Sequence, residues 1–368
     1  MSTKDLVSII VPTFREAKNI PVLTERIHEA MKAARIAYEV IVVDDNSQDG
    51  IEEAVNQLKK KKFPISIKVR LTERGLSSAV IEGFRLAKGT VFAVMDADLS
   101  HPPEKIPELV APIMGGSAEF VVGSRFVPGG SAEHFNWFRR LNAWVSKTLA
   151  RPFTTVRDPM AGFFAFPKSI LPDLTLLNPL GFKIGLEVIV KGNPRTTMEI
   201  PIQFKERLYG ESKLSIKEQV NYLRHIIRLF EYKYESLAEM IKFGFVGGTG
   251  TVVNMAFVFL SYDVLSIAYR IAVAIGFLVS ATSNFILNRT FTFPKSRQLH
   301  SAVQYVLFIV VGGAGFAVNW FIAVYLYENN PFFHEHYLLA TFLGILGGMT
   351  INFTGSKLLV FRKGTTSA

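Results

Sequence analysis

Two acidic segments follow hydrophobic runs in the first half of the sequence. Asp96-Ala97-Asp98 comes directly after Val91 to Met95, and Asp44-Asp45 comes directly after Val40 to Val43. Hard carboxylate oxygens are the ligands that Mg²⁺ or Mn²⁺ prefers, and such an ion can bridge a diphosphate. Acidic residues after strands also often cap helices. Because the acidic pattern recurs after a second run, we favour a metal and phosphate site.

These carboxylates have to be positioned by the elements around them, which alternate between strand and helix. We expect strands at 7–11, 40–43, 65–71 and 91–95, and helices at 19–35, 51–60 and 77–87. This alternation predicts an α/β domain with a mostly parallel sheet and helices on both faces. Ligands of such sheets bind at the carboxyl ends of the strands. Those ends carry Thr13, Glu16, Asp44, Asp45, Asp96 and Asp98.

Composition separates the chain into a soluble and a membrane part. The 368 residues are 49% hydrophobic, and the charged residues thin out beyond about residue 235. The net charge of +10 fits an anionic membrane face and anionic substrates, since no nucleic-acid-binding motif is present. The absence of cysteine excludes disulfides, thiolate catalysis and Cys-ligated zinc.

Four apolar stretches in the second part are each long enough to span a bilayer: 243–262, 268–287, 303–327 and 337–359. The connector 288–300 and the C-terminal tail carry Lys and Arg, whereas the connector 328–336 carries neither. By the positive-inside rule, the soluble domain and the C-terminus face the cytoplasm. The basic, amphipathic segment 216–240 is expected to lie at the membrane interface, with packing onto a domain as the alternative.

The membrane part contains an internal repeat. Gly248-x-Gly250-x-x-x-Asn254 recurs as Gly313-x-Gly315-x-x-x-Asn319, and Asn284-Phe285 recurs as Asn352-Phe353. Two helix hairpins of one design are therefore expected, with small residues allowing close helix packing. We expect three segments in all: 1–215 catalytic, 216–240 interfacial and 241–368 transmembrane.

The soluble part resembles a known enzyme family in several motifs. Four of them are similar to those of the inverting family 2 glycosyltransferases: Val11-Pro12-Thr13-Phe14-Arg15-Glu16, Val42 to Ser47, Arg74 to Ala79 and Met95 to Glu104. Four others narrow the resemblance to the dolichyl-phosphate mannose synthases and their polyprenyl-phosphate relatives: Gly123 to Phe126, Asp158 to Phe164, Gly181 to Lys183 and Arg207 to Leu214. The resemblance implies a GT-A (Rossmann-like) catalytic domain, followed by an all-α, four-span domain similar to GtrA.

The resemblance also implies roles for individual residues. The nucleoside pocket would be lined by Pro12, Phe14, Glu16, Val43 and Asp45. Asp96, Ala97 and Asp98 would meet the ribose, the diphosphate and the metal, and the metal ligands would be Asp96, Asp98 and Ser100. Arg125 and Arg139 would bind the acceptor phosphate, and Arg207 and Lys213 the donor diphosphate. The residues expected to carry catalysis are Asp98, Arg125, Arg139 and Arg207.

Two positions depart from the family pattern. Several relatives have Gln where this chain has Ser100, which leaves the choice between Mg²⁺ and Mn²⁺ open. Relatives often have Ser four residues after the arginine that aligns with Arg139, where this chain has Ala143.

The leading hypothesis is transfer of mannose from GDP-mannose to dolichyl (polyprenyl) phosphate. An acceptor that is already anionic needs no strong general base, so catalysis would rest on alignment and charge neutralisation. UDP-glucose is the alternative donor. A transporter of lipid-linked sugars with a nucleotide-binding domain is the alternative from another class, although no predicted span carries the charges that often mark a polar pathway. A processive polysaccharide synthase is disfavoured because a Gln-x-x-Arg-Trp segment is lacking.

Overall fold

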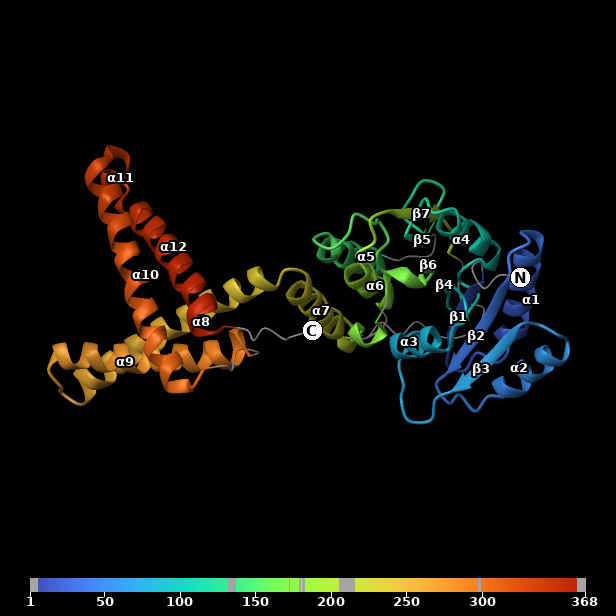
Figure 1. The fold of residues 1–368 in the computed structure, drawn as a ribbon, viewed down its shortest axis with the longest axis horizontal. Helices are drawn as coiled ribbons and strands as arrows, with labels where there is room; N and C mark the ends of the chain where they lie inside the picture. The colour runs from blue at the N-terminus through green and yellow to red at the C-terminus, as the bar shows by residue number, and fades with distance from the viewer. Residues whose placement is uncertain are drawn as a thin grey trace. The chain divides into compact units, whose positions relative to one another are not determined.

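The computed structural model describes residues 6–131, 137–171, 173–178, 180, 183–204, 216–294, 296 and 299–362. The chain divides into two compact units, Met1–Lys233 and Tyr234–Ala368 (Figure 1).

The first unit is built on a seven-stranded sheet with the order β3-β2-β1-β4-β6-β5-β7. Strand β6 is antiparallel to both of its neighbours, and all other pairs are parallel. The strands are β1 (Val7–Thr13), β2 (Tyr38–Asp44), β3 (Ile65–Val69), β4 (Val91–Val94), β5 (Phe120–Ser124), β6 (Phe164–Pro167) and β7 (Thr197–Pro201). The predicted mostly parallel α/β domain is confirmed.

Helices cover both faces of this sheet, as predicted. Alternate residues of a strand point to opposite faces, so Ile9 packs with one cluster of buried side chains and Ile10 with the other. The first cluster takes side chains from α1, α2 and α4, and the second from α3 and α6. The helices of the unit are α1 (Asn19–Ala33), α2 (Ile51–Lys60), α3 (Leu76–Leu86), α4 (Ile106–Met114), α5 (Trp137–Ala150), α6 (Ile184–Gly192) and α7 (Ile216–Lys233).

The helical period expected over 216–240 is divided between two helices. α7 ends at Lys233 and α8 begins at Glu235, because Tyr234 has a non-helical backbone (φ −123°, ψ 48°). α7 belongs to the first unit, where Tyr222, His225 and Leu229 are buried. Domain packing, the alternative interpretation of this segment, therefore holds for one face of α7.

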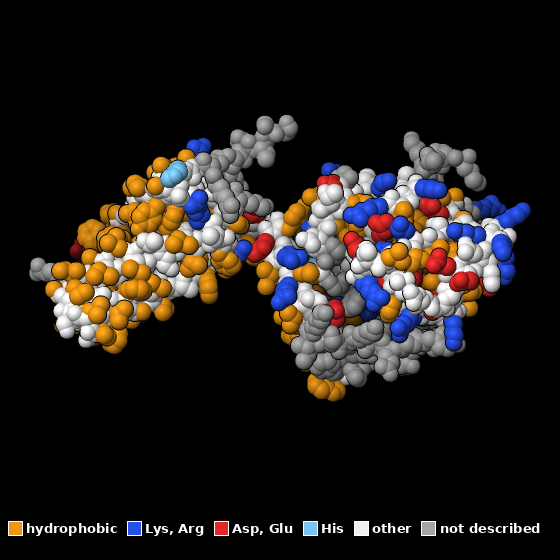
Figure 2. All heavy atoms as spheres, turned by 90° about the horizontal axis from the view of Figure 1, so that it is seen from below, with side chains coloured by type: hydrophobic (Ala, Val, Ile, Leu, Met, Phe, Trp, Pro, Cys, Tyr) orange, Lys and Arg blue, Asp and Glu red, His pale blue; other side chains and the backbone are white. Residues whose placement is uncertain are grey.

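The second unit consists of two helix hairpins, in which α8 packs on α9 and α10 packs on α12. Its surface is dominated by hydrophobic side chains, whereas charged side chains are spread over the first unit (Figure 2). The helices are α8 (Glu235–Phe259), α9 (Tyr269–Leu287), α10 (Ser301–Asn329), α11 (Pro331–Glu335) and α12 (Tyr337–Gly355).

Within the described residues, three segments of this unit are long and apolar enough to cross a membrane: Glu235–Val264, Ser301–Asn329 and Phe342–Val360. They correspond to three of the four predicted spans. The fourth predicted stretch forms α9, a helix of 19 residues, in which the side chains of 269, 270 and 273 lie outside the described part of the chain.

The internal repeat is visible in how the hairpins pack. A Cβ at Gly250 would collide with the Asn284 amide, and a Cβ at Gly315 would collide with the Asn352 amide. Each hairpin ends in a π-helical turn, Asn288–Thr292 in the first and Ser356–Val360 in the second. The next residues, Phe293 and Phe361, stack with their ring centroids 4.9 Å apart. These close contacts support the interpretation of the repeated Gly and Asn residues as packing positions.

Candidate active site

The site lies where the order of the strands reverses. β1 pairs with β2 on one side and with β4 on the other, so strands are added on opposite sides of β1. In sheets of this kind the ligand crevice lies at this point, outside the carboxyl ends of the strands. Thr13 ends β1, Asp44 ends β2, and Asp96 lies two residues beyond β4. The antiparallel β6 begins at the same edge, which brings the segment before Phe164 to it.

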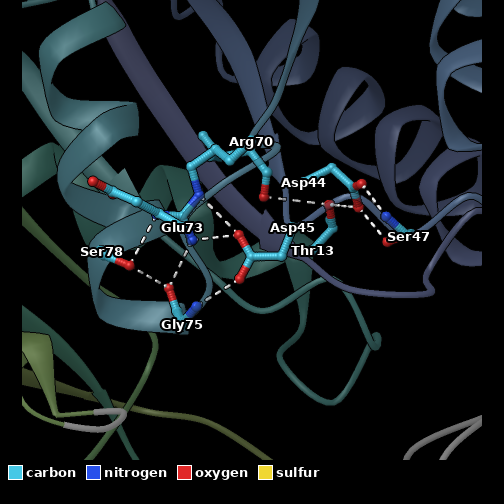
Figure 3. Close-up of polar contacts among 9 residues, drawn as sticks. Thr13, Asp44, Asp45, Ser47, Arg70, Glu73, Gly75 and Ser78 are labelled. Carbon is cyan, nitrogen blue, oxygen red and sulfur yellow. Dashed lines mark hydrogen bonds and ion pairs between the residues drawn. The ribbon is translucent and has the colours of Figure 1, made fainter.

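Asp44 holds two loops of this edge together. Its side chain is 1% exposed and accepts hydrogen bonds from Thr13 Oγ1 (3.0 Å) and from the Ser47 N–H (2.8 Å) and hydroxyl (Figure 3). Ser47 Oγ in turn accepts the N–H of Arg15 (2.7 Å). Asp44 therefore joins the loop after β1 to the loop after β2.

Asp45 points to a different partner, the buried Arg70. Asp45 Oδ1 accepts hydrogen bonds from Arg70 Nε (2.8 Å) and Nη2, and Oδ2 accepts the Gly75 N–H (2.7 Å). Arg70 is not among the residues that the sequence predicts for the site. The strand expected over 65–71 includes it, whereas β3 ends at Val69 and leaves Arg70 at the carboxyl edge. A basic residue near the end of a predicted strand is the signal that could have identified it.

The other predicted nucleoside residues differ in accessibility. The Phe14 ring is 37% exposed, and the guanidinium groups of Arg15 and Arg74 lie 5.2 Å and 5.8 Å from its centroid. Pro12 and Val43 are paired across the sheet and both are buried. Glu16 accepts a hydrogen bond from Asn19 Nδ2 (2.6 Å) at the start of α1.

The Asp96-Ala97-Asp98 segment forms a tight turn after β4. Asp98 Oδ1 accepts the hydroxyl (2.6 Å) and the N–H (3.1 Å) of Ser100, while Ala97 is buried. Asp96 lies against Gly162, where a Cβ would come within 3.0 Å of Asp96 Oδ2. Glycine at 162 therefore lets the segment before β6 approach the carboxylate.

The donor set of this turn fits a hard divalent cation. Among the residues that the structure describes, no group of three or more His, Asp or Glu side chains could hold a metal ion. Mg²⁺ is usually held by one or two carboxylates together with substrate phosphates. Asp96 and Asp98 are two carboxylates of one turn, so the residues present match such a site in kind.

Arg125 follows β5 and is paired with Asp158. Its Nε and Nη2 each donate a hydrogen bond of 2.8 Å to one oxygen of that carboxylate, and its backbone N–H donates a third (3.1 Å). Asp158 is 1% exposed, and its own N–H donates to Glu199 Oε1 (3.1 Å). Burial works to lower the pKa of Arg125, but the hydrogen bonds and charge of Asp158, helped by Asp96, raise it overall. The guanidinium is therefore both oriented and kept charged.

Lys183 adds a second basic side chain near Arg125 and Asp158. Burial, reinforced by the charge of Arg125, lowers the pKa of Lys183, while Asp158, Asp96 and Glu218 act in the opposite direction. No hydrogen bond or ion pair joins Lys183 to any residue that the structure describes. The sequence identifies the motif that contains Lys183, but gives this residue no role. Arg125 and Lys183 therefore place two basic side chains in the same part of the unit.

Three predicted residues cannot be placed in the same detail. Arg139 lies in α5, but its side chain is outside the described residues, and Arg207 and Lys213 fall in 205–215, also outside them. Their roles stay predictions.

Two families match this chain: Glycosyl transferase family 2 over residues 8–175, and GtrA/DPMS, transmembrane domain, over residues 242–367. A dolichol-phosphate mannosyltransferase of Pyrococcus furiosus is 39% identical over 344 residues, covering 92% of this chain and 95% of the relative. Dolichol-phosphate mannosyltransferases of Mycosarcoma maydis and Saccharomyces cerevisiae are 40% and 41% identical, over 62% of this chain and over 80% and 88% of their own lengths.

Solved structures with a similar fold are more distant. A glucosyl-3-phosphoglycerate synthase of Mycobacterium tuberculosis has a TM-score of 0.45 at 15% identity, covering 62% of this chain and 80% of its own. A mannosyl-3-phosphoglycerate synthase of Rubrobacter xylanophilus has a TM-score of 0.47 at 15% identity, covering 63% of this chain and 75% of its own.

Proposed function

The chain belongs to the dolichol-phosphate mannosyltransferase family, and from this premise we propose that it transfers mannose from GDP-mannose to dolichyl (polyprenyl) phosphate with inversion. The observation that carries the proposal is the Arg125–Asp158 pair at the edge of the sheet, with the charges of Asp96 and Lys183 close enough to act on it. The positive charges of Arg125 and Lys183, together with the carboxylate of Asp96, suit a reaction in which both substrates carry phosphate groups.

The residues present support a direct displacement. An oxygen of the acceptor phosphate forms the new bond to the anomeric carbon, while the bond to the donor diphosphate breaks and GDP leaves with the electron pair. The attacking oxygen is anionic at neutral pH, so no side chain has to remove a proton. Arg125, held by Asp158, orients the acceptor phosphate, and alignment and charge neutralisation lower the barrier.

We propose that Asp96 and Asp98 hold Mg²⁺ or Mn²⁺. The bound ion would neutralise charge on the departing diphosphate. Ser100 donates two hydrogen bonds to Asp98 Oδ1, so we propose that it orients this carboxylate. The direct contact of Ser100 with the metal, expected from the sequence, stays a prediction.

The first unit has a surface suited to a membrane interface. Val220, Leu223 and Ile227 are 41%, 49% and 56% exposed on α7, and Trp137 and Trp144 are 75% and 63% exposed on α5. The two helices are joined by a hydrogen bond from the Tyr222 hydroxyl to the Ser146 carbonyl (2.7 Å). Exposed Trp and aliphatic side chains on neighbouring helices are typical of interfacial binding, which would bring the unit to an acceptor whose chain lies in the bilayer.

The cysteine-free sequence allows the orientation to be tested directly. We propose that the first unit and the C-terminus face the cytoplasm, following the basic residues of the connector 288–300. A single cysteine introduced in that connector should react with an impermeant maleimide only after the cytoplasmic side is opened. Labelling from outside intact cells would contradict this orientation.

Transfer can be tested with the purified full-length protein in lipid nanodiscs. Dolichyl phosphate and Mn²⁺ would be offered with radiolabelled GDP-mannose or UDP-glucose, in separate reactions. We expect labelled lipid from GDP-mannose, and loss of it with Asp98→Ala or with a chelator. Transfer from UDP-glucose alone would overturn the proposed donor, transfer from neither would overturn the enzyme, and full activity of Asp98→Ala would overturn the metal assignment.

A further inference from the structure

Arg70 is a buried arginine at the edge of the sheet with no role in the transfer proposed above. The structure assigns it to the donor's nucleoside pocket as a positioning residue: through Asp45 and Gly75 it sets one wall of the pocket. The inference rests on the proposed function in one respect, which is that the nucleoside of the donor occupies the crevice beside Phe14 and Asp45.

The guanidinium of Arg70 contacts three residues from two other segments of the chain (Figure 3). It donates from Nε and Nη2 to Asp45 Oδ1, from Nη2 to the Gly75 carbonyl (3.0 Å), and from Nη1 to Ser78 Oγ (2.9 Å). Asp45 follows β2, Gly75 precedes α3, and Ser78 lies in the first turn of α3. One side chain that is 6% exposed thus ties the end of β2 to the start of α3.

This arrangement limits what Asp45 can still bind. Two bonds from Arg70 end on Oδ1, and the Gly75 N–H ends on Oδ2. A carboxylate offers about four acceptor positions, so one position on Oδ2 is left for a ligand. Arg70 therefore decides which oxygen of Asp45 faces the crevice, and in which direction. A ring N–H of the donor's base is the kind of group that this position would accept.

The same contacts also place Arg74 against Phe14. Gly75 has φ 135° and ψ 137°, a backbone conformation that residues with side chains rarely adopt. Its N–H is held by Asp45 and its carbonyl by Arg70 and Ser78. The adjacent Arg74 lies with its guanidinium 5.8 Å from the Phe14 ring. Aromatic rings and guanidinium groups are surfaces on which a nucleobase stacks.

A purely stabilising ion pair is the competing explanation. Buried ion pairs often add little net stability compared with apolar replacements, so stability alone is a weak reason for a buried Arg-Asp pair. The two explanations differ in what they predict for a folded variant. If Arg70 positions Asp45 and Gly75, its loss changes the KM for the donor and leaves the KM for the acceptor unchanged.

The test uses Arg70→Met and Arg70→Lys in the full-length protein, with Arg85→Gln as the control. Arg85 is exposed on α3 and pairs with Glu82. We expect Arg70→Met to raise the KM for GDP-mannose and the Kd for GDP about tenfold, as when one hydrogen bond to a charged group is lost. The KM for dolichyl phosphate and kcat should stay within about twofold. Arg70→Lys keeps a positive charge for Asp45 but loses the several N–H donors of the planar guanidinium. Its affinity for the donor should therefore lie between those of Arg70→Met and the wild type.

The possible outcomes distinguish a positioning role of Arg70 from a purely structural one. A folded Arg70→Met with the donor KM of the control would overturn the inference. If Arg70→Met does not fold, Arg70→Lys decides: a raised donor KM in a protein with unchanged melting temperature supports positioning, whereas an unchanged KM or loss of folding shows a structural role only. GDP binding is measured by calorimetry without turnover. A wild-type protein that binds GDP but transfers no mannose would therefore overturn the proposed function and leave the Arg70 comparison readable.

Discussion

The Arg125 guanidinium and the Asp158 carboxylate face each other with two parallel hydrogen bonds of 2.8 Å. The carboxylate is almost completely buried, so its charge is compensated by the guanidinium and the backbone N–H of Arg125 rather than by water. Such a fork fixes the plane of the guanidinium as well as its position. A group that receives a phosphate in one orientation needs this kind of support.

Asp158→Asn should therefore weaken acceptor binding more than donor binding. The amide cannot accept both Arg125 hydrogen bonds, so the guanidinium loses its orientation. We expect kcat/KM for dolichyl phosphate to fall about a hundredfold, as for other preorganised groups, with GDP binding nearly unchanged. The measurement is initial rate against acceptor concentration. Asp173→Asn is the control, because Asp173 accepts hydrogen bonds from Thr175 in an exposed turn, and equal losses in both variants would contradict the prediction.

Lys183→Met should reduce transfer without unfolding the protein. Removing a partly buried ammonium beside Arg125 relieves charge repulsion between the two side chains, so thermal stability without substrate should hold or rise. The substrate phosphates lose a neutralising charge, and we expect kcat/KM to fall about a hundredfold. Lys105→Met is a matched control, since Lys105 pairs with Glu108 on the exposed start of α4. Activity close to that of the control would rule out a role in phosphate binding.

His225 should make the first unit sensitive to acid. Burial lowers its pKa below the ordinary 6.5, with Glu187 opposing this shift and Lys191 and Arg228 adding to it. The unfolded chain then binds the proton at a higher pH than the folded one, so the stabilising contribution is present above pH 6.5 and is lost as pH falls below it. Melting temperatures between about pH 7.5 and about pH 5.5 should fall more steeply for the wild type than for His225→Gln. Parallel curves would refute the assignment.

The glycines of the second unit offer two matched pairs of variants. Gly250→Ala and Gly315→Ala would each push a Cβ into an Asn amide, whereas a Cβ added at Gly248 or Gly313 would meet nothing within 4 Å. Overpacking costs about 1–3 kcal/mol, so the first pair should lower the melting temperature of the protein in nanodiscs. Gly248→Ala and Gly313→Ala should leave it unchanged. A similar decrease in all four variants would contradict the packing interpretation, because Ala is a better helix former than Gly and propensity alone would not lower the melting temperature.

Much of the first unit could be predicted from the sequence because its strands are continuous buried runs. In a parallel sheet such runs bring their carboxyl ends to one edge, and this is enough to predict that Thr13, Asp44, Asp45 and Asp96 lie together. For α7, by contrast, the spacing of the apolar residues does not show which face of the helix is buried. Its apolar residues fall on two faces, and only packing shows that Tyr222 and Leu229 are buried while Leu223 and Ile227 are exposed.

The adjacent carboxylates Asp44 and Asp45 show what could not be predicted from the sequence. By itself the sequence determined that both reach the edge of the sheet. The tertiary structure decided that Asp44 joins two loops and that Asp45 meets Arg70, because consecutive residues of an extended chain point in opposite directions. The partners of Asp45 and Arg125 lie 25 and 33 positions away. No local pattern records contacts of that kind, since they form only when separate strands and loops are packed side by side.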